Sequence, residues 1–132
     1  MMKWRFLIVD QEEAGRVLLS SHLKASFPGC KIYEATSGED AMGQLKTMET
    51  LPVMAFFSHN TPDLTSIGFL GETRQLGTKT TLPTAIIANN LENDKAMALY
   101  RLGASVVLER PLKKHEVKEA VQDFARATVR AA

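Results

Sequence analysis

Short runs of hydrophobic residues alternate along the chain with longer stretches in which hydrophobic residues recur every third or fourth position. The runs are rich in β-branched and aromatic residues and are hydrophobic at consecutive positions, as is typical of strands covered on both faces. Strands that alternate with helices indicate an α/β fold in which helices wrap a parallel sheet. We predict five strands, over Arg5 to Val9, Lys31 to Ala35, Val53 to Phe57, Thr84 to Ala88 and Ser105 to Leu108.

The stretches between the predicted strands carry hydrophobic stripes with the period of an α-helix. We expect these stripes to face the core; they are Leu19, Leu23 and Phe27, then Ala41, Leu45 and Met48, then Ala98 and Leu102, and last Val117, Val121 and Phe124. Ser37 and Asp40 resemble a capping box that opens the second helix. Gly103 is suited to end the fourth helix in a left-handed conformation.

The third predicted helix, about Thr65 to Leu76, is the weakest of the five. It contains Gly68 and Gly71, and glycine in a helix interior costs about 1 kcal/mol relative to alanine. We therefore expect this helix to be short or mobile.

Length and charge narrow the class of protein. The chain has 132 residues, which suits one compact domain, predicted over residues 1–126, with 127–132 as a tail or the start of a linker to an output domain. The formal net charge is +1 and the basic residues are scattered, so nucleic-acid binding is disfavoured. A single cysteine, Cys30, excludes an intramolecular disulfide and a cysteine-rich metal site. Without a signal peptide or membrane span in the sequence, we expect a cytoplasmic protein.

An open parallel sheet places its functional site beyond the carboxyl ends of its strands. The residues at these ends are Asp10 and Gln11, then Ser58, then Ala88 and Asn89, and finally Arg110 and Pro111. No glycine-rich phosphate turn and no Walker lysine follow the first strand, so dinucleotide and P-loop chemistry are excluded.

Four motifs occur in order along the chain: Leu7-Ile8-Val9-Asp10, the Pro62-Asp63-Leu64 loop, Pro83-Thr84-Ala85-Ile86-Ile87, and Gly103-Ala104 followed seven residues later by Pro111. In this order and spacing they make the chain similar to a receiver domain of two-component response regulators. The resemblance covers nearly the whole chain. It implies a flavodoxin-like (βα)5 three-layer sandwich with a parallel sheet in the order 2-1-3-4-5.

The resemblance also implies a phosphorylation site, and this chain departs from it at most positions. The family has an acidic pair that holds Mg²⁺ and an aspartate that accepts the phosphoryl group, whereas only Asp10 remains of the pair, Gln11 takes its second place and Ser58 takes the acceptor position. Because Mg²⁺ requires hard anionic oxygens, we expect its binding to be weak or lost. Ala88 replaces the hydroxyl residue that contacts the phosphoryl group, and Val107 replaces the aromatic switch residue.

Arg110 stands where the family carries a lysine before the proline. We expect its guanidinium to form a salt bridge with Asp10 or a hydrogen bond with Ser58, which would fill the vacated site. The alternative is a retained anion site, in which Arg110 and backbone amides hold phosphate or sulfate without transferring it.

The first hypothesis is therefore a degenerate receiver, or pseudo-receiver, that is not an enzyme and signals through protein contacts. Its partners would be a sensor kinase, an output domain or a second copy of the chain. Met97, Tyr100 and Arg101 lie off the predicted buried face of the fourth helix and form a candidate contact surface. The second hypothesis is an atypical receiver phosphorylated at Ser58, His59 or Asp63. A third, an enzyme or small-ligand binder of flavodoxin-like fold, has no supporting constellation in the sequence.

Overall fold

The computed structural model describes residues 4–59, 61, 63–76 and 82–125. Five segments of the chain form one parallel sheet. Its strands lie in the order β2-β1-β3-β4-β5, and all four neighbouring pairs are parallel. The strands are β1 (Arg5–Val9), β2 (Lys31–Ala35), β3 (Met54–Ser58), β4 (Thr84–Ala88) and β5 (Val106–Glu109). The predicted fold class and strand order are thus confirmed.

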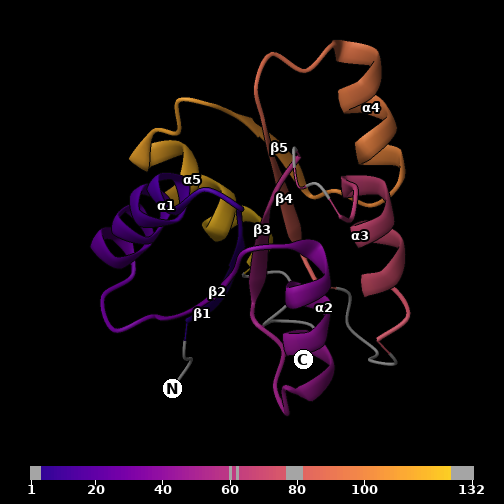
Figure 1. The fold of residues 1–132 in the computed structure, drawn as a ribbon. Coiled ribbons are helices and arrows are strands. Elements are labelled where there is room, and N and C mark those ends of the chain that lie inside the picture. Colours follow the sequence, from indigo (N-terminus) through magenta and orange to yellow (C-terminus); the bar gives the residue numbers. More distant parts are fainter. Residues whose placement is uncertain (1–3, 60, 62, 77–81, 126–132) are drawn as a thin grey trace.

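Helices cover both faces of the sheet (Figure 1). The helices are α1 (Glu13–Ser26), α2 (Gly38–Thr47), α3 (Ser66–Thr73), α4 (Asn93–Arg101) and α5 (Lys114–Ala120), and α5 continues as the π-helical segment η1 (Val121–Ala125). Figure 1 shows α1 and α5 on one side of the sheet and α2, α3 and α4 on the other. The connections between parallel strands therefore supply the two outer layers of a three-layer sandwich.

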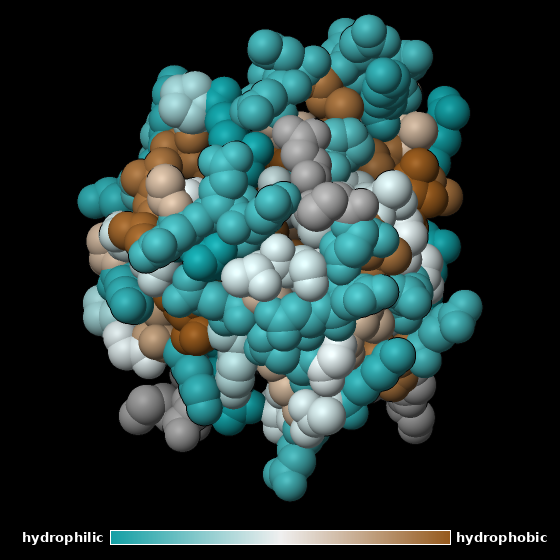
Figure 2. All heavy atoms as spheres, viewed as in Figure 1, coloured by the Kyte–Doolittle hydropathy of each residue, from teal (hydrophilic) through white to brown (hydrophobic). Residues whose placement is uncertain are grey.

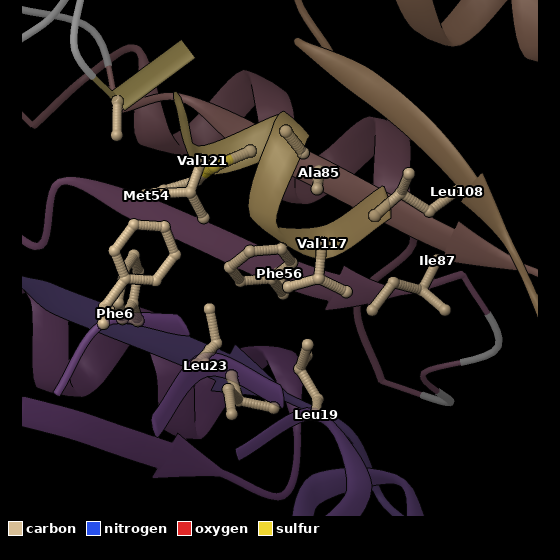
Figure 3. Close-up of a cluster of buried hydrophobic side chains, with 14 residues drawn as sticks. Phe6, Leu19, Leu23, Met54, Phe56, Ala85, Ile87, Leu108, Val117 and Val121 are labelled. Atoms are coloured by element: carbon tan, nitrogen blue, oxygen red, sulfur yellow. The ribbon is translucent and has the colours of Figure 1, made fainter. Parts of the chain in front are cut away.

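The core consists of two hydrophobic clusters, one on each face of the sheet. Successive strand residues point to opposite faces, so Phe6 and Ile8 of β1 belong to the first cluster while Leu7 and Val9 belong to the second. Figure 3 shows the first cluster, in which strand side chains meet those of α1, α5 and η1. Consecutive hydrophobic residues in the strands follow directly from this two-sided burial.

Two strands begin and end one residue later than predicted. β3 is Met54–Ser58 rather than Val53 to Phe57, because Ser58 pairs in register with Ile87 of β4. β5 is Val106–Glu109 rather than Ser105 to Leu108. The acceptor position is therefore the last residue of a strand and not the first residue of a loop.

The helix predictions need one correction. Leu99 is the buried residue of α4, whereas Ala98 and Leu102 are only half-buried, because the rotation of α4 places Leu99 in the second cluster. The third helix spans Ser66–Thr73, so the prediction of a short helix is confirmed. Met48 and Phe124 are partly buried against the two clusters, and the other predicted stripe residues outside α4 are buried.

The predicted helix ends are largely confirmed. Ser37 caps α2, since its side chain accepts a hydrogen bond from the backbone N–H of Asp40. Asp40 reaches back to the N–H of Thr36, one residue before the position that a capping box would use. After α4, Gly103 adopts a positive φ of 113°.

On the face that Figure 2 shows, hydrophobic residues occur in small separate groups among hydrophilic ones. Within the described residues, no helix combines the length and hydropathy needed to cross a membrane. The predicted tail, residues 127–132, lies outside the described residues, as does the last residue of the predicted domain.

Candidate functional site

The carboxyl ends of β1, β3 and β4 and the residue after β5 surround a small polar pocket of about 120 Å³. Adjacent parallel strands bring these ends to one edge of the sheet, although the residues are far apart in sequence. The pocket is lined by Asp10, Gln11, Glu12, Ser58, Asn89 and Arg110. Four of the predicted site residues, Asp10, Gln11, Ser58 and Arg110, are thus brought together.

Arg110 joins the ends of β1 and β3. Its Nη2 atom lies 3.2 Å from Oδ2 of Asp10 and 3.2 Å from Oγ of Ser58, so one guanidinium nitrogen donates to both oxygens. The side chains of Arg110 and Asp10 are 28% and 12% exposed, which leaves the ion pair only partly solvated. Both contacts expected of Arg110 from the sequence are therefore present at once.

The carboxylate of Asp10 is occupied on both oxygens. Oδ1 accepts a hydrogen bond of 2.9 Å from the backbone N–H of Glu12, and Oδ2 accepts from Arg110. Gly15 of α1 lies so close that a Cβ atom at this position would collide with Oδ2 of Asp10. The carboxylate is consequently fixed by a loop amide, a cation and a helix that has no side chain at the contact.

Arg16 fixes the loop between β1 and α1. Its Nη1 donates to the backbone carbonyls of Asp10 and Gln11 at 2.8 and 3.2 Å, and its Nε donates to Glu34 of β2 at 3.2 Å. Gln11 itself is exposed, with its carbonyl engaged by Arg16. The residue at the second metal position is therefore an exposed amide on a loop that Arg16 holds.

The two switch positions lie in or beside the edge strand. Ala88 is buried at the end of β4, where its carbonyl accepts from the N–H of Arg110 at 3.0 Å and its side chain offers no hydroxyl. Val107 is partly buried against the second cluster. The backbone N–H of Val107 donates to the hydroxyl of Tyr100 at 3.0 Å, so α4 is tied to the outer edge of β5.

The alternative acceptor residues point to other partners. His59 Nδ1 lies 2.8 Å from Oγ of the buried Ser66, a contact between the residue after β3 and the first residue of α3. The carboxylate of Asp63 accepts from the backbone N–H groups of Gly38 and Glu39 at 3.0 and 2.9 Å. These hydrogen bonds, the one from Glu39 foremost, lower the pKa of Asp63.

The candidate contact residues of α4 lie outside the polar pocket. Met97 and Tyr100 are 54% and 46% exposed, and Arg101 is exposed as well. Their predicted exposure is confirmed.

Cys30 packs partly buried against the first cluster, and this burial raises the pKa of its thiol.

The donor set of the polar pocket limits the chemistry available there. Among the residues that the structure describes, Asp10 and Glu12 are the carboxylates that line it, and the guanidinium of Arg110 already contacts one oxygen of Asp10. Within the described residues, no group of three or more His, Cys, Asp or Glu side chains is arranged to hold a metal ion. Ser58 is buried and its hydroxyl accepts a hydrogen bond from a cation, whereas a serine nucleophile requires a base that removes its proton.

Sequence reasoning missed two residues that shape the site, Gly15 and Arg16. Gly15 falls inside a helical stretch, where a glycine is unfavourable unless something approaches the backbone closely, and that cost is the signal that was available. Arg16 has no comparable signal, because its contacts depend on how α1 and β2 are placed relative to each other.

No protein-family model matches the sequence, and no curated protein matches it. Solved structures are similar in fold: the signal receiver domain of a putative Luxo repressor protein from Vibrio parahaemolyticus aligns with a TM-score of 0.86 and 19% identity, over 98% of this chain and 95% of that chain. A response regulator receiver domain protein from Clostridium thermocellum gives 0.86 and 15% identity, over 98% and 99%. NtrX from Brucella abortus gives 0.83 and 20% identity, over 98% of this chain and 28% of that longer chain. The chain therefore has the receiver-domain fold.

Proposed function

We propose that this chain is a receiver-fold signalling domain that acts through protein contacts and is not switched by aspartyl phosphorylation. The observation that carries the proposal is the bridge from Arg110 to Asp10 and Ser58. In this bridge the acceptor position carries the neutral hydroxyl of Ser58, and a cation contacts Asp10, the one carboxylate that remains of the acidic pair.

Loss of Mg²⁺ binding is part of the proposal. Mg²⁺ prefers near-octahedral coordination by hard oxygens, with carboxylates supplying the charge. Here both oxygens of Asp10 are engaged, Gln11 offers a neutral amide and Ser58 a hydroxyl. The other carboxylate that lines the pocket, Glu12, is exposed, and it alone would have to offset the repulsion between Mg²⁺ and the guanidinium of Arg110.

The signalling surface that we propose is the exposed face of α4 with Met97, Tyr100 and Arg101. An aromatic residue, a methionine and an arginine are the residue types enriched at protein interfaces. Three kinds of partner fit the proposal: a kinase, an output domain or a second copy of this chain.

Phosphotransfer with a small donor tests the proposal. The chain is incubated with Mg²⁺ and acetyl phosphate, and its intact mass is measured. We expect no added phosphate. The control is the double variant Gln11→Asp with Ser58→Asp, which restores the acidic pair and the acceptor carboxylate on the same fold. We expect this variant to gain one phosphate that hydroxylamine removes, as expected of an acyl phosphate.

Two outcomes contradict the proposal. A phosphorylated wild-type chain would favour the atypical receiver, and peptide mapping would then assign the phosphate to Ser58, His59 or Asp63. Saturable binding of inorganic phosphate that the substitution Arg110→Met abolishes would favour the retained anion site. We expect neither, since two carboxylates line the same pocket as Arg110.

A further inference from the structure

A second and larger pocket, of about 380 Å³, shares Asp10 and Arg110 with the polar pocket. It lies between α1, the ends of β1 and β4, and the segment that follows β5. It is lined by Ile8, Val9, Asp10, Gly15, Leu18, Leu19, Ile87, Arg110, Pro111 and Leu112. We refer to it as the apolar pocket, because only Asp10 and Arg110 among these residues carry charge.

The size and lining of the apolar pocket suit a small molecule. Ligand sites usually occupy roughly 300–1,000 Å³ and combine an apolar wall with few polar groups. A cavity of about 150 Å³ already holds a benzene ring, so this pocket has room for a ligand larger than benzene. Because Asp10 and Arg110 also line the polar pocket, their ion pair connects the two spaces.

Part of the wall of the apolar pocket belongs to the buried core. Ile8, Leu19 and Ile87 are buried members of the first cluster, and Figure 3 labels Leu19 and Ile87 among its side chains. Nε2 of His22 on α1 lies 3.2 Å from the carbonyl oxygen of Leu112, which links the helix to the segment after β5. Leu18, by contrast, is 45% exposed and gives access from solvent.

Arg110 supplies the polar contact. A guanidinium has five N–H donors on three nitrogen atoms. Nη2 serves both Asp10 and Ser58, while Nη1 and Nε have no hydrogen-bond partner among the described residues. The charges of Arg110 and Asp10 cancel, so a ligand with a full charge would lose its hydration in the apolar pocket without a net attraction to offset that cost, whereas a neutral carbonyl oxygen can accept from the guanidinium at a smaller cost.

We propose that the apolar pocket binds a small neutral molecule with a hydrocarbon body and a carbonyl acceptor. The body lies against the side chains of β1, α1 and β4, and the carbonyl oxygen accepts from Nη1 or Nε of Arg110. Since the same guanidinium donates to Ser58, a ligand in the apolar pocket changes the environment of Ser58 at the carboxyl end of β3. This binding does not rest on the proposed function, because it needs neither a phosphodonor nor Mg²⁺.

The test titrates the isotope-labelled full chain with 2-octanone and follows its backbone amide resonances. We expect saturable shifts at Gly15, Leu18, Leu112 and Ser58, with a dissociation constant on the order of a millimolar for a probe of this size. Octanoate and octylammonium, which share the hydrocarbon chain but carry a charge, should bind about tenfold more weakly.

Matched variants on α1 locate the site. Leu18→Trp fills the entrance and should weaken binding of 2-octanone about tenfold, and Leu18→Phe less so. Val17→Trp is the control, since Val17 is the neighbouring exposed residue of α1 and does not line the pocket. We expect Val17→Trp to bind 2-octanone as the unmodified chain does.

Three results would overturn the proposal. The first is the absence of saturable shifts up to about 10 mM 2-octanone, a tenfold excess over the expected dissociation constant. The second is equal weakening by Val17→Trp and Leu18→Trp, with all variants folded by circular dichroism. The third is equal affinity for the ketone and the charged probes, which would remove the role of Arg110 as a hydrogen-bond donor.

Discussion

At the scale of single residues, the site depends on one guanidinium nitrogen that donates to two oxygens. Exposed ion pairs contribute about 0–1 kcal/mol, but removal of one partner from a pair that is shielded from water leaves a charge without compensation. The Asp10 and Arg110 side chains are 12% and 28% exposed and lie between these limits. Arg110 therefore stabilises the carboxyl end of β1 as well as filling the site.

A double-mutant cycle measures this stabilisation. Arg110→Met keeps the hydrocarbon volume but removes the cation, so we expect the free energy of unfolding to fall by about 1–3 kcal/mol. Asp10→Asn should cost a similar amount, and the double variant should cost about 1 kcal/mol less than the sum. Urea unfolding gives all three values.

The exposed Arg101 provides the control, because Arg101→Met should change the free energy of unfolding by less than about 0.5 kcal/mol. If the effects of Arg110→Met and Asp10→Asn were additive, the two side chains would not interact in solution, and their ion pair would not contribute to the free energy of unfolding.

Residue contacts at the site could be predicted from sequence only where topology alone brings the residues together. Asp10 follows β1 and Ser58 ends the neighbouring strand β3, so the strand order places these two side by side. Arg110 follows β5, which is separated from β3 by β4, and its long side chain reaches both. The contact between Gly15 and Asp10 depends instead on how closely α1 approaches the sheet. Such a distance is set by packing of the whole layer and has no local signal beyond the unfavourable glycine.

At the scale of secondary-structure elements, the loop after β3 stabilises the start of α2. The first N–H groups of a helix have no partner within the helix, and a carboxylate there also interacts favourably with the helix dipole. Asp63 accepts from two of these groups, those of Gly38 and Glu39, while Ser37 accepts from a third, that of Asp40. Asp63 thus acts as a cap supplied from another part of the chain.

This cap makes stability depend on pH. The pKa of Asp63 is lowered in the folded chain from its ordinary value of 3.8, so its contribution is fully present above 3.8 and is lost as pH falls through the folded value. Asp63→Asn keeps an acceptor oxygen but removes the charge, so it should lower the free energy of unfolding at pH 7 by about 0.3–1 kcal/mol. Urea unfolding at a series of pH values should show the gap between the two proteins closing below 3.8.

A difference in the free energy of unfolding between the two proteins that stays constant down to the lowest pH would contradict the role of Asp63 as a cap. It would mean that ionisation of Asp63 does not contribute to stability. Glu119→Gln is a suitable control for acid effects in general, since Glu119 is exposed on α5.

Two glycines of α2 should respond to alanine in opposite directions. A Cβ at Gly38 would collide with the Cβ of Leu64, whereas nothing lies within 4 Å of a Cβ at Gly43. Gly43→Ala should therefore stabilise the protein by about 0.5–1 kcal/mol through helix propensity. Gly38→Ala should destabilise it by about 1–3 kcal/mol through overpacking. Thermal unfolding of both variants checks the sign, and a stabilising Gly38→Ala would contradict the close contact with Leu64.

Elements were predictable from sequence to the extent that their hydrophobic pattern is local. The three strands β1, β2 and β4 have the predicted bounds, because their hydrophobic runs end at polar or turn residues. β3 extends one residue further since Ser58 completes a ladder with β4, which requires knowledge of the partner strand. The prediction of the buried face of α4 was wrong for a similar reason, because the rotation of this helix is decided by how Leu99 fits the second cluster.

At the scale of the whole molecule, the fold and the site are separable. Two clusters on either face of the sheet supply the core, and Asp10, Ser58 and Arg110 belong to neither. Changes among these residues alter the edge of the sheet at an energetic cost much smaller than loss of either cluster. Residues at this edge of the sheet can consequently be replaced while the fold is kept.

Thermal unfolding with and without Mg²⁺ tests this separation on the intact chain. A ligand that binds only the folded state raises its stability by RT ln(1 + [L]/Kd), so about 10 mM Mg²⁺ at a site with a Kd of about 1 mM would add about 1.4 kcal/mol. For a domain of this size that corresponds to roughly 3–7 °C in Tm. We expect no such shift for the unmodified chain, because the guanidinium of Arg110 contacts the one strand-end carboxylate. Gln11→Asp with Ser58→Asp should gain a shift, since it supplies two further carboxylates beside Asp10; equal shifts in both proteins would show that Mg²⁺ binds without them.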